Sequence, residues 1–377
     1  KKAGLGKIVR LIDSDNDGKA DKHTEYAKVN NPRGLLAIGN KVYVLHSTFT
    51  KDGIIDNQYL SVFTDADNDG IADGPAKTLV KDIGNHTPLK SRGTDHSTNG
   101  IRLGIDGWIY ISVGDFGFQK ATGTDGKTLN FQGGGIVRVR PDGTGLETFV
   151  HGTRNVYDVA IDPFMNVYTR ENTNDGVGWW IRFSHYIQSG EYGYPSLYTN
   201  FPEDMLSALN EYGGGSGTGG LYLSEPSWPD HYNNKPLLAD WGRSTIFIHA
   251  AEAEQASFIA KEPTVFLKVS QVTDLDVDAS GRMYIAAWAG AGWTGNAKRG
   301  YVVRVLPEGF VYKPFPKLSN LTDAKLLDHL ASESHTARVY AQQEILDRKA
   351  TKLLPQIDAL ARDKKLTLEA RVAALYT

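Results

Sequence analysis

The chain has 377 residues, of which 40% are hydrophobic and 23% charged, as expected for a large globular protein with an ample core. The net charge of −3 gives no electrostatic reason to expect nucleic acid or an anionic membrane as partner. The absence of cysteine excludes disulfides, thiolate catalysis, Cys-ligated zinc and covalently attached haem. No apolar stretch predicts a transmembrane segment or a signal peptide. From the abrupt start at Lys1 and stop at Thr377 we expect a mature or trimmed chain.

Two Asp-rich segments share one spacing. A strand-like run, residues 5–12, precedes DSDNDGKAD at 13–21, and the pattern returns as DADNDGIAD at 65–73. Carboxylates at alternate positions around a glycine provide the oxygen ligands that calcium prefers. Neither segment is an EF-hand, because neither has the twelfth-position Glu, and a metal-free turn is the alternative. We predict structural calcium, with ligands from Asp13, Asp15, Asp17, Asp21, Asp65, Asp67, Asp69 and Asp73.

A second repeat consists of an apolar strand, a turn with Asp-Gly or Gly-Asn, and another apolar strand. Its copies are residues 34–45, 101–113, 156–168 and 272–286, with a weaker copy at 236–248. Hairpins repeated at intervals of tens of residues are typical of a β-propeller. A sandwich is the competing fold, but it does not explain the polar residues before the first strand of each repeat. We predict an all-β, six-bladed β-propeller.

The propeller is expected to span residues 1–315, with residues 5–12 closing the ring against residues 301–306. The glycine-rich stretch GGGSGTGG, residues 213–220, has neither the Lys nor the strand-to-helix context of a phosphate-binding loop. We therefore expect it to be a flexible loop or a lid near the channel mouth.

From about residue 316 the apolar spacing becomes helical, with a capping signal at Thr322 and Asp323. The short helical stretches in residues 316–377 look like the first units of a HEAT-type solenoid. A solenoid needs further repeats to bury its last face, so we expect the natural protein to continue beyond Thr377.

One stretch, residues 94–117, gathers the residues that can carry chemistry. It predicts a hairpin whose open end presents Asp95, His96, Asn99 and Asp115. Taken singly, Asp115 and Asp158 are expected to be turn or inter-blade hydrogen-bonding residues. The cluster as a whole predicts a functional site.

The order of motifs resembles that of the soluble quinoprotein sugar dehydrogenases. Asp95-His96 precede a strand that ends in SVGD, TRN follows at 153–155, and GEYGYP at 190–195. The segments TRENTNDG, RFSHYIQSGEYGYP, GGGSGTGGLYL and ADWGRSTIF look still closer to the bacterial membrane-bound or sorbosone-type dehydrogenases, which have a propeller, HEAT repeats and a C-terminal cytochrome domain.

The resemblance implies a six-bladed propeller that binds pyrroloquinoline quinone (PQQ) and calcium and oxidises a carbohydrate or polyol. It also implies a c-type cytochrome as electron acceptor, in trans or in a further domain, and a periplasmic or cell-surface location in a bacterium.

The same resemblance assigns roles to individual residues. His96 would be the general base, Asp95 would orient it, and Arg154 with Asn155 would bind the quinone, next to Asn99. Backbone carbonyls of Asn172, Thr173, Asn174 and Asp175 would hold calcium. Further quinone-clamping arginines of the family are missing from residues 271–274, and their charge would have to come from Arg33, Arg243, Lys298 or Arg299.

Two other functions are compatible with the sequence. A metal-dependent polysaccharide lyase or hydrolase would also need His96 as base, with Arg154 neutralising a uronate. A non-catalytic glycan-binding propeller on a solenoid would need neither.

Overall fold

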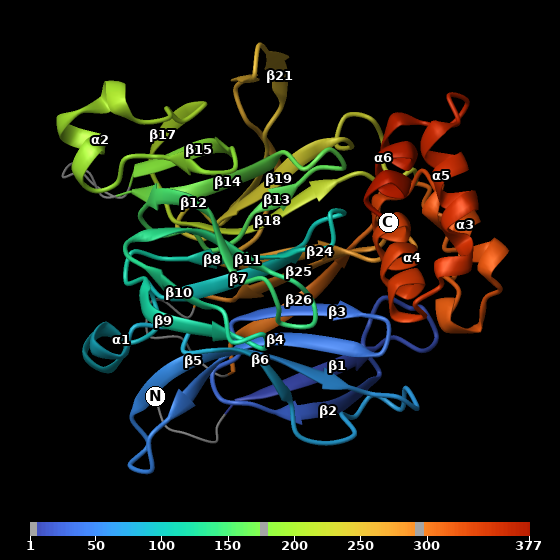
Figure 1. The fold of residues 1–377 in the computed structure, drawn as a ribbon, viewed down its shortest axis with the longest axis horizontal. Helices are drawn as coiled ribbons and strands as arrows, with labels where there is room; N and C mark the ends of the chain where they lie inside the picture. Colours follow the sequence, from blue (N-terminus) through green and yellow to red (C-terminus); the bar gives the residue numbers. More distant parts are fainter. Residues whose placement is uncertain (1–5, 174–179, 291–297) are drawn as a thin grey trace.

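The computed structural model describes residues 6–173, 180–290 and 298–377. In this part of the chain, five β-sheets of three or more strands form the blades of a propeller, and an α-helical segment follows them (Figure 1). The innermost strand of every blade contributes residues to one central cavity. The predicted all-β propeller with C-terminal helices is therefore confirmed.

The first blade carries two additional strands at its outer edge, and the second blade carries one additional parallel strand. The strands of the first blade are β3 (Gly34–Ile38), β4 (Lys41–Phe49), β5 (Ile55–Thr64) and β6 (Lys77–Lys81), extended by β9 (Phe118–Gly123) and β10 (Thr128–Phe131). Those of the second are β7 (Thr98–Leu103), β8 (Ile109–Val113), β11 (Gly134–Val139) and β12 (Glu147–Thr153), extended by β16 (Gly190–Glu191).

The remaining blades are smaller. The third contains β13 (Ala160–Ile161), β14 (Val167–Thr173), β15 (Trp180–Tyr186) and β17 (Asn210–Gly214), and the fourth contains β18 (Gly217–Leu223), β19 (Lys235–Asp240), β20 (Thr245–Ile248) and β23 (Thr264–Lys268). The fifth contains β24 (Val272–Val277), β25 (Met283–Trp288) and β26 (Gly300–Val305). Two separate hairpins are formed by β1 (Lys7–Ile12) with β2 (Lys22–Lys28) and by β21 (Ala251–Glu254) with β22 (Ser257–Ala260).

The helices lie mostly at the C-terminal end of the chain. They are α1 (His86–Arg92), α2 (Ser196–Asn200), η1 (Pro202–Asp204), η2 (Leu318–Asn320), α3 (Asp323–Leu330), α4 (His335–Asp347), η3 (Thr351–Leu353), α5 (Leu354–Arg362) and α6 (Leu368–Tyr376). The predicted cap of α3 is present, since the Thr322 side chain accepts a hydrogen bond from the Lys325 amide. Within the described ranges, no helix has the length and apolar character needed to cross a membrane.

The β7–β8 hairpin illustrates why these sequences form blades. Gly107 adopts φ 76°, and its amide donates to the Gly104 carbonyl, which closes the turn. All five residues of β8 are buried, as expected for a strand with a packed surface on both faces. The predicted hairpins at 34–45, 101–113, 156–168, 236–248 and 272–286 all correspond to paired strands.

The glycine-rich stretch 213–220 is not a lid, so that expectation was wrong. Its second half begins β18, the innermost strand of the fourth blade. A Cβ on Gly217 would lie 1.7 Å from the Arg170 carbonyl oxygen, and a Cβ on Gly219 would lie 2.6 Å from the Asp274 Cα atom. The glycines are therefore required for close packing between blades rather than for flexibility.

The expected count of six blades was also wrong, because the described residues form five. The expected closure of the ring was wrong as well: β1 pairs with β2 and not with residues 301–306. Pairing with a strand a few residues away costs less loop-closure entropy than pairing with one about three hundred residues away. The β1–β2 hairpin thus stays a two-stranded sheet beside the first blade.

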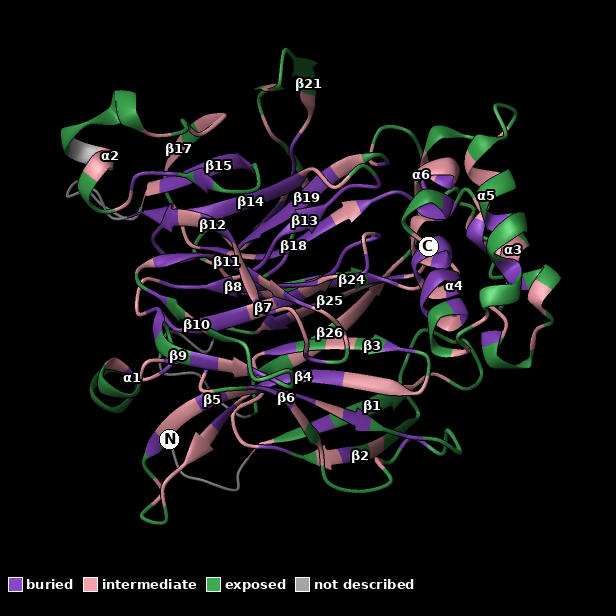
Figure 2. Cartoon of the chain, in the orientation of Figure 1, coloured by how far each residue is buried: buried purple, intermediate pink, exposed green. Residues whose placement is uncertain are grey.

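The helical segment shares its core with the propeller. Leu326, Leu330 and Ile345 belong to the same buried cluster as Leu103 and Ile105 of the second blade. Figure 2 shows this buried interior continuing from the strands into the inner faces of α4 and α6. The HEAT-like nature of the segment stays a prediction.

Candidate functional site

The candidate site lies at one end of the central channel, where loops from several blades meet. His96 precedes β7, Asp115 follows β8, and Arg154 follows β12. The start of β7 pairs with the end of β8, since Thr98 lies opposite Val113. This pairing brings His96 and Asp115 together although 19 positions separate them.

His96 is held by a carboxylate and an aromatic ring. Its Nδ1 atom lies 2.5 Å from Asp115 Oδ1, and its ring stacks on Phe116 at a centroid distance of 5.5 Å. His96 is only 3% exposed. A carboxylate at Nδ1 fixes the proton there, which leaves the Nε2 lone pair available to accept a proton.

Asp95 occupies the other side of the imidazole. Its Oδ2 atom is 3.7 Å from His96 Nε2, and its side chain is 49% exposed. Tyr157 donates its hydroxyl to Asp95 Oδ1 over 2.5 Å, and burial together with the Asp95 charge raises the pKa of Tyr157 to about 12. Asp115, rather than the expected Asp95, is therefore the carboxylate that orients His96.

A second network joins three blades beside the histidine. Arg33 donates to Thr94 over 2.9 Å and to the Asn99 side-chain oxygen. The Asn99 amide in turn donates to the Val156 carbonyl over 3.1 Å and to Asn155 Oδ1 over 3.4 Å. Asn99, Asn155 and Arg33 are thus brought close to His96, as the sequence predicted for a site at this end.

Arg154 and Asn155 are fixed by the end of β14. The Arg154 guanidinium donates to Asn172 Oδ1 over 2.5 Å, and Arg154 is 8% exposed. The backbone of Asn155 pairs with that of Asn172. The Asn172 carbonyl, expected as a calcium ligand, accepts a hydrogen bond from the Asn155 amide over 3.3 Å.

The other predicted site residues are placed differently. Thr173 donates to the Trp180 carbonyl, while Asn174 and Asp175 lie outside the described residues. Arg243 donates to the Gly214 and Tyr212 carbonyls, 2.6 Å each, so it ties down a neighbouring loop. Lys298 stands two positions before β26.

The Asp-rich loops do not belong to this end of the channel. Residues of the 65–73 loop border a cavity that is otherwise lined by the helical segment and the β3–β4 turn. The carboxylates of Asp13, Asp15 and Asp17 lie close together, as do those of Asp65, Asp67 and Asp69. Asp21 and Asp73 instead accept hydrogen bonds from Ser14 and from the Ala66 amide at the start of their loops.

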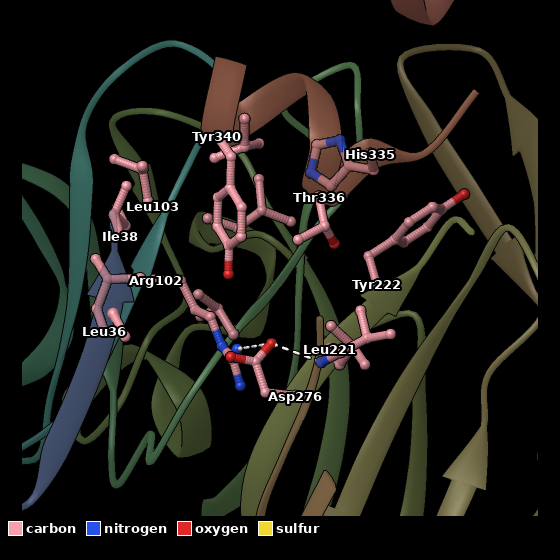
Figure 3. A pocket seen from close by; sticks show the side chains of 16 residues that line it. Leu36, Ile38, Arg102, Leu103, Leu221, Tyr222, Asp276, His335, Thr336 and Tyr340 are labelled. Atoms are coloured by element: carbon pink, nitrogen blue, oxygen red, sulfur yellow. Dashed lines mark hydrogen bonds and ion pairs between the residues drawn. The ribbon is translucent and has the colours of Figure 1, made fainter. Parts of the chain in front are cut away.

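The far end of the channel is closed by α4. Thr336 and Tyr340 point from this helix into a cavity of about 90 Å³ (Figure 3). Below them Arg102 forms ion pairs with Asp158 at 2.8 Å, Asp274 at 3.1 Å and Asp276 at 3.2 Å. Burial raises the pKa of Asp158 despite the Arg102 charge. The expected inter-blade role of Asp158 is confirmed, because Arg102 belongs to the second blade and Asp274 to the fifth.

Sequence reasoning assigned no site role to Tyr157, Phe116 or Thr94. Only their position in the sequence could have identified them as site residues. Each lies within a few residues of a strand end that also carries a predicted site residue. Asp115 was grouped with His96 but was expected to be a turn residue when taken singly. Only the pairing of β7 with β8 shows which carboxylate reaches the imidazole.

Several solved structures share this fold. A glucose dehydrogenase-type oxidoreductase from Thermus thermophilus is 16% identical, with 77% of this chain and 89% of that chain covered and a TM-score of 0.57. The PQQ-bound aldose sugar dehydrogenase from Streptomyces coelicolor is 17% identical, with 76% and 85% covered and a TM-score of 0.55. The soluble aldose sugar dehydrogenase from Escherichia coli, in its apo form, is 13% identical, with 80% and 90% covered and a TM-score of 0.51.

The predicted resemblance to quinoprotein sugar dehydrogenases is therefore confirmed at the level of the fold. No curated protein matches the chain. A family model described as "Domain of unknown function (DUF7133)" matches residues 1–208, more than half of the sequence. The chain belongs to this DUF7133 family.

Proposed function

We propose that the protein is a carbohydrate or polyol dehydrogenase that oxidises a sugar hydroxyl with a bound quinone. The observation that carries the proposal is the His96–Asp115 pair, 2.5 Å apart, on the inter-strand loops at one end of the propeller. Arg33 reaches the same loop at Thr94, and Arg154 follows β12 of the same blade. Oxidation of an alcohol carbon requires a base for the hydroxyl proton and an acceptor for the hydride. The relatives that share the fold include a PQQ-bound sugar dehydrogenase, which supports the choice of acceptor.

In this proposal His96 takes the hydroxyl proton at Nε2. Asp115 keeps Nδ1 protonated and stabilises the imidazolium that forms, so the base is held in one tautomer and one orientation. Because His96 is buried, the substrate hydroxyl approaches beside the half-exposed Asp95, whose carboxylate lies 3.7 Å from Nε2. Asp95 also lowers the energy of the transient positive charge on the ring.

The arginines of the site fit an anionic planar cofactor such as PQQ. Arg33 donates its hydrogen bonds to the neutral side chains of Thr94 and Asn99, and its buried Nε has no hydrogen-bond partner among the described residues. Arg154, which follows β12 and is 8% exposed, would stabilise negative charge on the cofactor oxygens. When bound, the quinone supplies a two-electron acceptor for the hydride. Arg33, Arg154 and Asn155 would hold it in place of the family's missing arginines.

The proposal also covers the metal ion, the electron acceptor and the location of the protein. Calcium would be held near residues 172–175, electrons would leave to a c-type cytochrome, and the protein would act in the periplasm or at the cell surface. The resemblance supports each of these. A carbohydrate substrate is consistent with the half-exposed carboxylate of Asp95, which could accept hydrogen bonds from sugar hydroxyls.

The test is a PQQ titration with calcium present, followed by dye reduction on a panel of sugars. We expect PQQ binding and sugar-dependent dye reduction. A His96→Asn variant should retain PQQ binding but lose turnover by about 10²–10⁴-fold. The matched control is His23→Asn, an exposed histidine on β2, which should behave as the wild type.

Equal turnover of the His96→Asn variant and the wild type would remove His96 as the base. Absence of PQQ binding at tens of micromolar cofactor would refute PQQ as the cofactor. Formation of new unsaturated ends in an acidic polysaccharide would establish a lyase instead.

A further inference from the structure

The two Asp-rich loops, residues 13–21 and 65–73, fold alike and are called the twin loops below. In each, three carboxylates offer one oxygen apiece within 4.8 Å of one another. These carboxylates belong to Asp13, Asp15 and Asp17 in the first loop and to Asp65, Asp67 and Asp69 in the second. Three negative charges held this closely repel one another unless a cation lies between them.

The most buried carboxylate of the second loop points to a missing ligand. Asp65 is 8% exposed, and its Oδ2 atom accepts the Gly70 amide over 3.0 Å. Its Oδ1 atom is buried and has no hydrogen-bond partner in the described part of the chain. Burial of an anionic oxygen without a partner costs free energy, so such atoms are normally paired with a donor or a metal.

The first loop repeats this arrangement. Asp13 Oδ2 accepts the Gly18 amide over 3.1 Å and lies 2.6 Å from Arg304 Nη1. Asp13 Oδ1, like Asp65 Oδ1, is buried without a hydrogen-bond partner among the residues described. The same oxygen is thus left unpaired at the same position of both loops.

Tyr26, on β2, connects the hairpin to the second loop. It is 6% exposed, and its carbonyl accepts the Ala72 amide over 2.9 Å. The Tyr26 hydroxyl is also buried without a hydrogen-bond partner among the described residues. The second loop is therefore packed directly against the β1–β2 hairpin.

Both loops lie at the seam of the ring, where the β1–β2 hairpin adjoins the first and fifth blades. The Arg304–Asp13 pair connects the first loop to β26 of the fifth blade. Ile8 and Tyr26 of the hairpin pack on Val44 and Phe63 of the first blade. Since β1 pairs with β2 alone, no described strand pairing closes this seam.

We infer that each twin loop binds one calcium ion and that the two ions fasten the β1–β2 hairpin into the seam of the propeller. Calcium suits carboxylate oxygens, which it accepts in sets of six to eight with carbonyl and water oxygens. The ion would neutralise the three carboxylates and pair the orphaned oxygens of Asp13 and Asp65. This inference is independent of the dehydrogenase proposal, because it uses no residue of the His96 site.

The test is calcium binding to chelator-stripped protein by calorimetry, together with terbium luminescence excited through Tyr26. We expect the wild type to bind two calcium ions at the twin loops, in addition to the ion proposed near residues 172–175. Each of the variants Asp13→Asn/Asp15→Asn and Asp65→Asn/Asp67→Asn should bind one ion fewer than the wild type. Calcium should also raise the melting temperature by about a few degrees and protect the β1–β2 hairpin from proteolysis. In Tyr26→Phe, terbium emission from the second loop should fall while calcium binding stays.

The matched control is Asp142→Asn. Asp142 is an exposed turn residue whose Oδ1 accepts the Thr144 amide over 3.0 Å, as Asp67 accepts the Asp69 amide over 3.1 Å. It lies outside both carboxylate clusters, so this variant should bind as many ions as the wild type. If a double variant does not fold, the exposed single changes Asp15→Asn and Asp67→Asn should each weaken one site at least tenfold.

Absence of calcium binding at millimolar concentration would overturn the inference. So would two unchanged sites in folded double variants. If a variant loses one calcium site without any change in melting temperature or in proteolysis of the β1–β2 hairpin, calcium does not fasten the hairpin to the propeller.

Discussion

The buried ion pair under the site gives a sharp stability prediction. Glu171 Oε1 lies 2.6 Å from Arg182 Nη2, and their side chains are 0% and 1% exposed. Glu171 stands on β14 beside Asn172, which holds Arg154, so the pair also supports the channel mouth. Glu171→Gln would leave the Arg182 guanidinium buried without its counter-charge.

The expected cost is about 3–5 kcal/mol of unfolding free energy, the range for removing one partner of a buried pair. Urea unfolding followed by tryptophan fluorescence measures it. The matched control is Glu147→Gln, since Glu147 pairs with Arg138 at 2.7 Å but is 33% exposed. We expect this more exposed pair to contribute about 1 kcal/mol or less.

A double variant separates the charge effect from packing. Burial raises the pKa of Glu171 even though Arg182 lowers it, so desolvation outweighs the attraction between the two groups. Glu171→Leu/Arg182→Met should therefore be closer in stability to the wild type than Glu171→Gln. If Glu171→Gln costs no more than Glu147→Gln, the reasoning from burial is refuted.

Three further predictions concern the site and the channel. Asp115→Asn should reduce sugar turnover by about 10²–10⁴-fold at unchanged PQQ affinity, and Asp95→Asn should have a smaller effect; equal losses would contradict the assignment of Asp115 as the orienting carboxylate. Because burial raises the pKa of Asp158 above its unfolded value of about 3.9, its stabilising contribution is present at acid pH and lost as the pH rises through the native pKa. Asp158→Asn should therefore flatten the fall of unfolding free energy above pH 4 in pH-dependent urea melts, and an unchanged slope would contradict this. Gly217→Ala should prevent native folding, since its Cβ would meet the Arg170 carbonyl at 1.7 Å, and a wild-type circular dichroism melt would contradict it.

Local signals in the sequence predicted the repeating unit of the fold. The Asp106-Gly107 turn and the apolar runs around it specify a hairpin within a dozen residues. The Thr322 cap and the 3.6-residue spacing after it likewise predicted α3 and its successors. Each of these features depends on neighbours in the chain.

Contacts between distant parts of the chain could not be predicted from such local patterns. The closure of the ring depends on whether β1 pairs with β2 or with β26, and both partners are compatible with its pattern. The glycines at 217 and 219 looked like a flexible loop, because the Arg170 carbonyl and the Asp274 backbone that crowd them come from other blades. In the same way, Asp95 adjoins His96 in sequence, but the β7–β8 pairing brings Asp115 to Nδ1.

Reduction of bound PQQ by a sugar, followed by absorbance in a single turnover, tests the proposed function most directly. The experiment compares the wild type with His96→Asn, both loaded with PQQ and calcium. The account predicts that a sugar rapidly reduces the quinone in the wild type and at least about 10²-fold more slowly in the variant. Equal rates in the two proteins, or no reduction by any sugar despite bound PQQ, would contradict it.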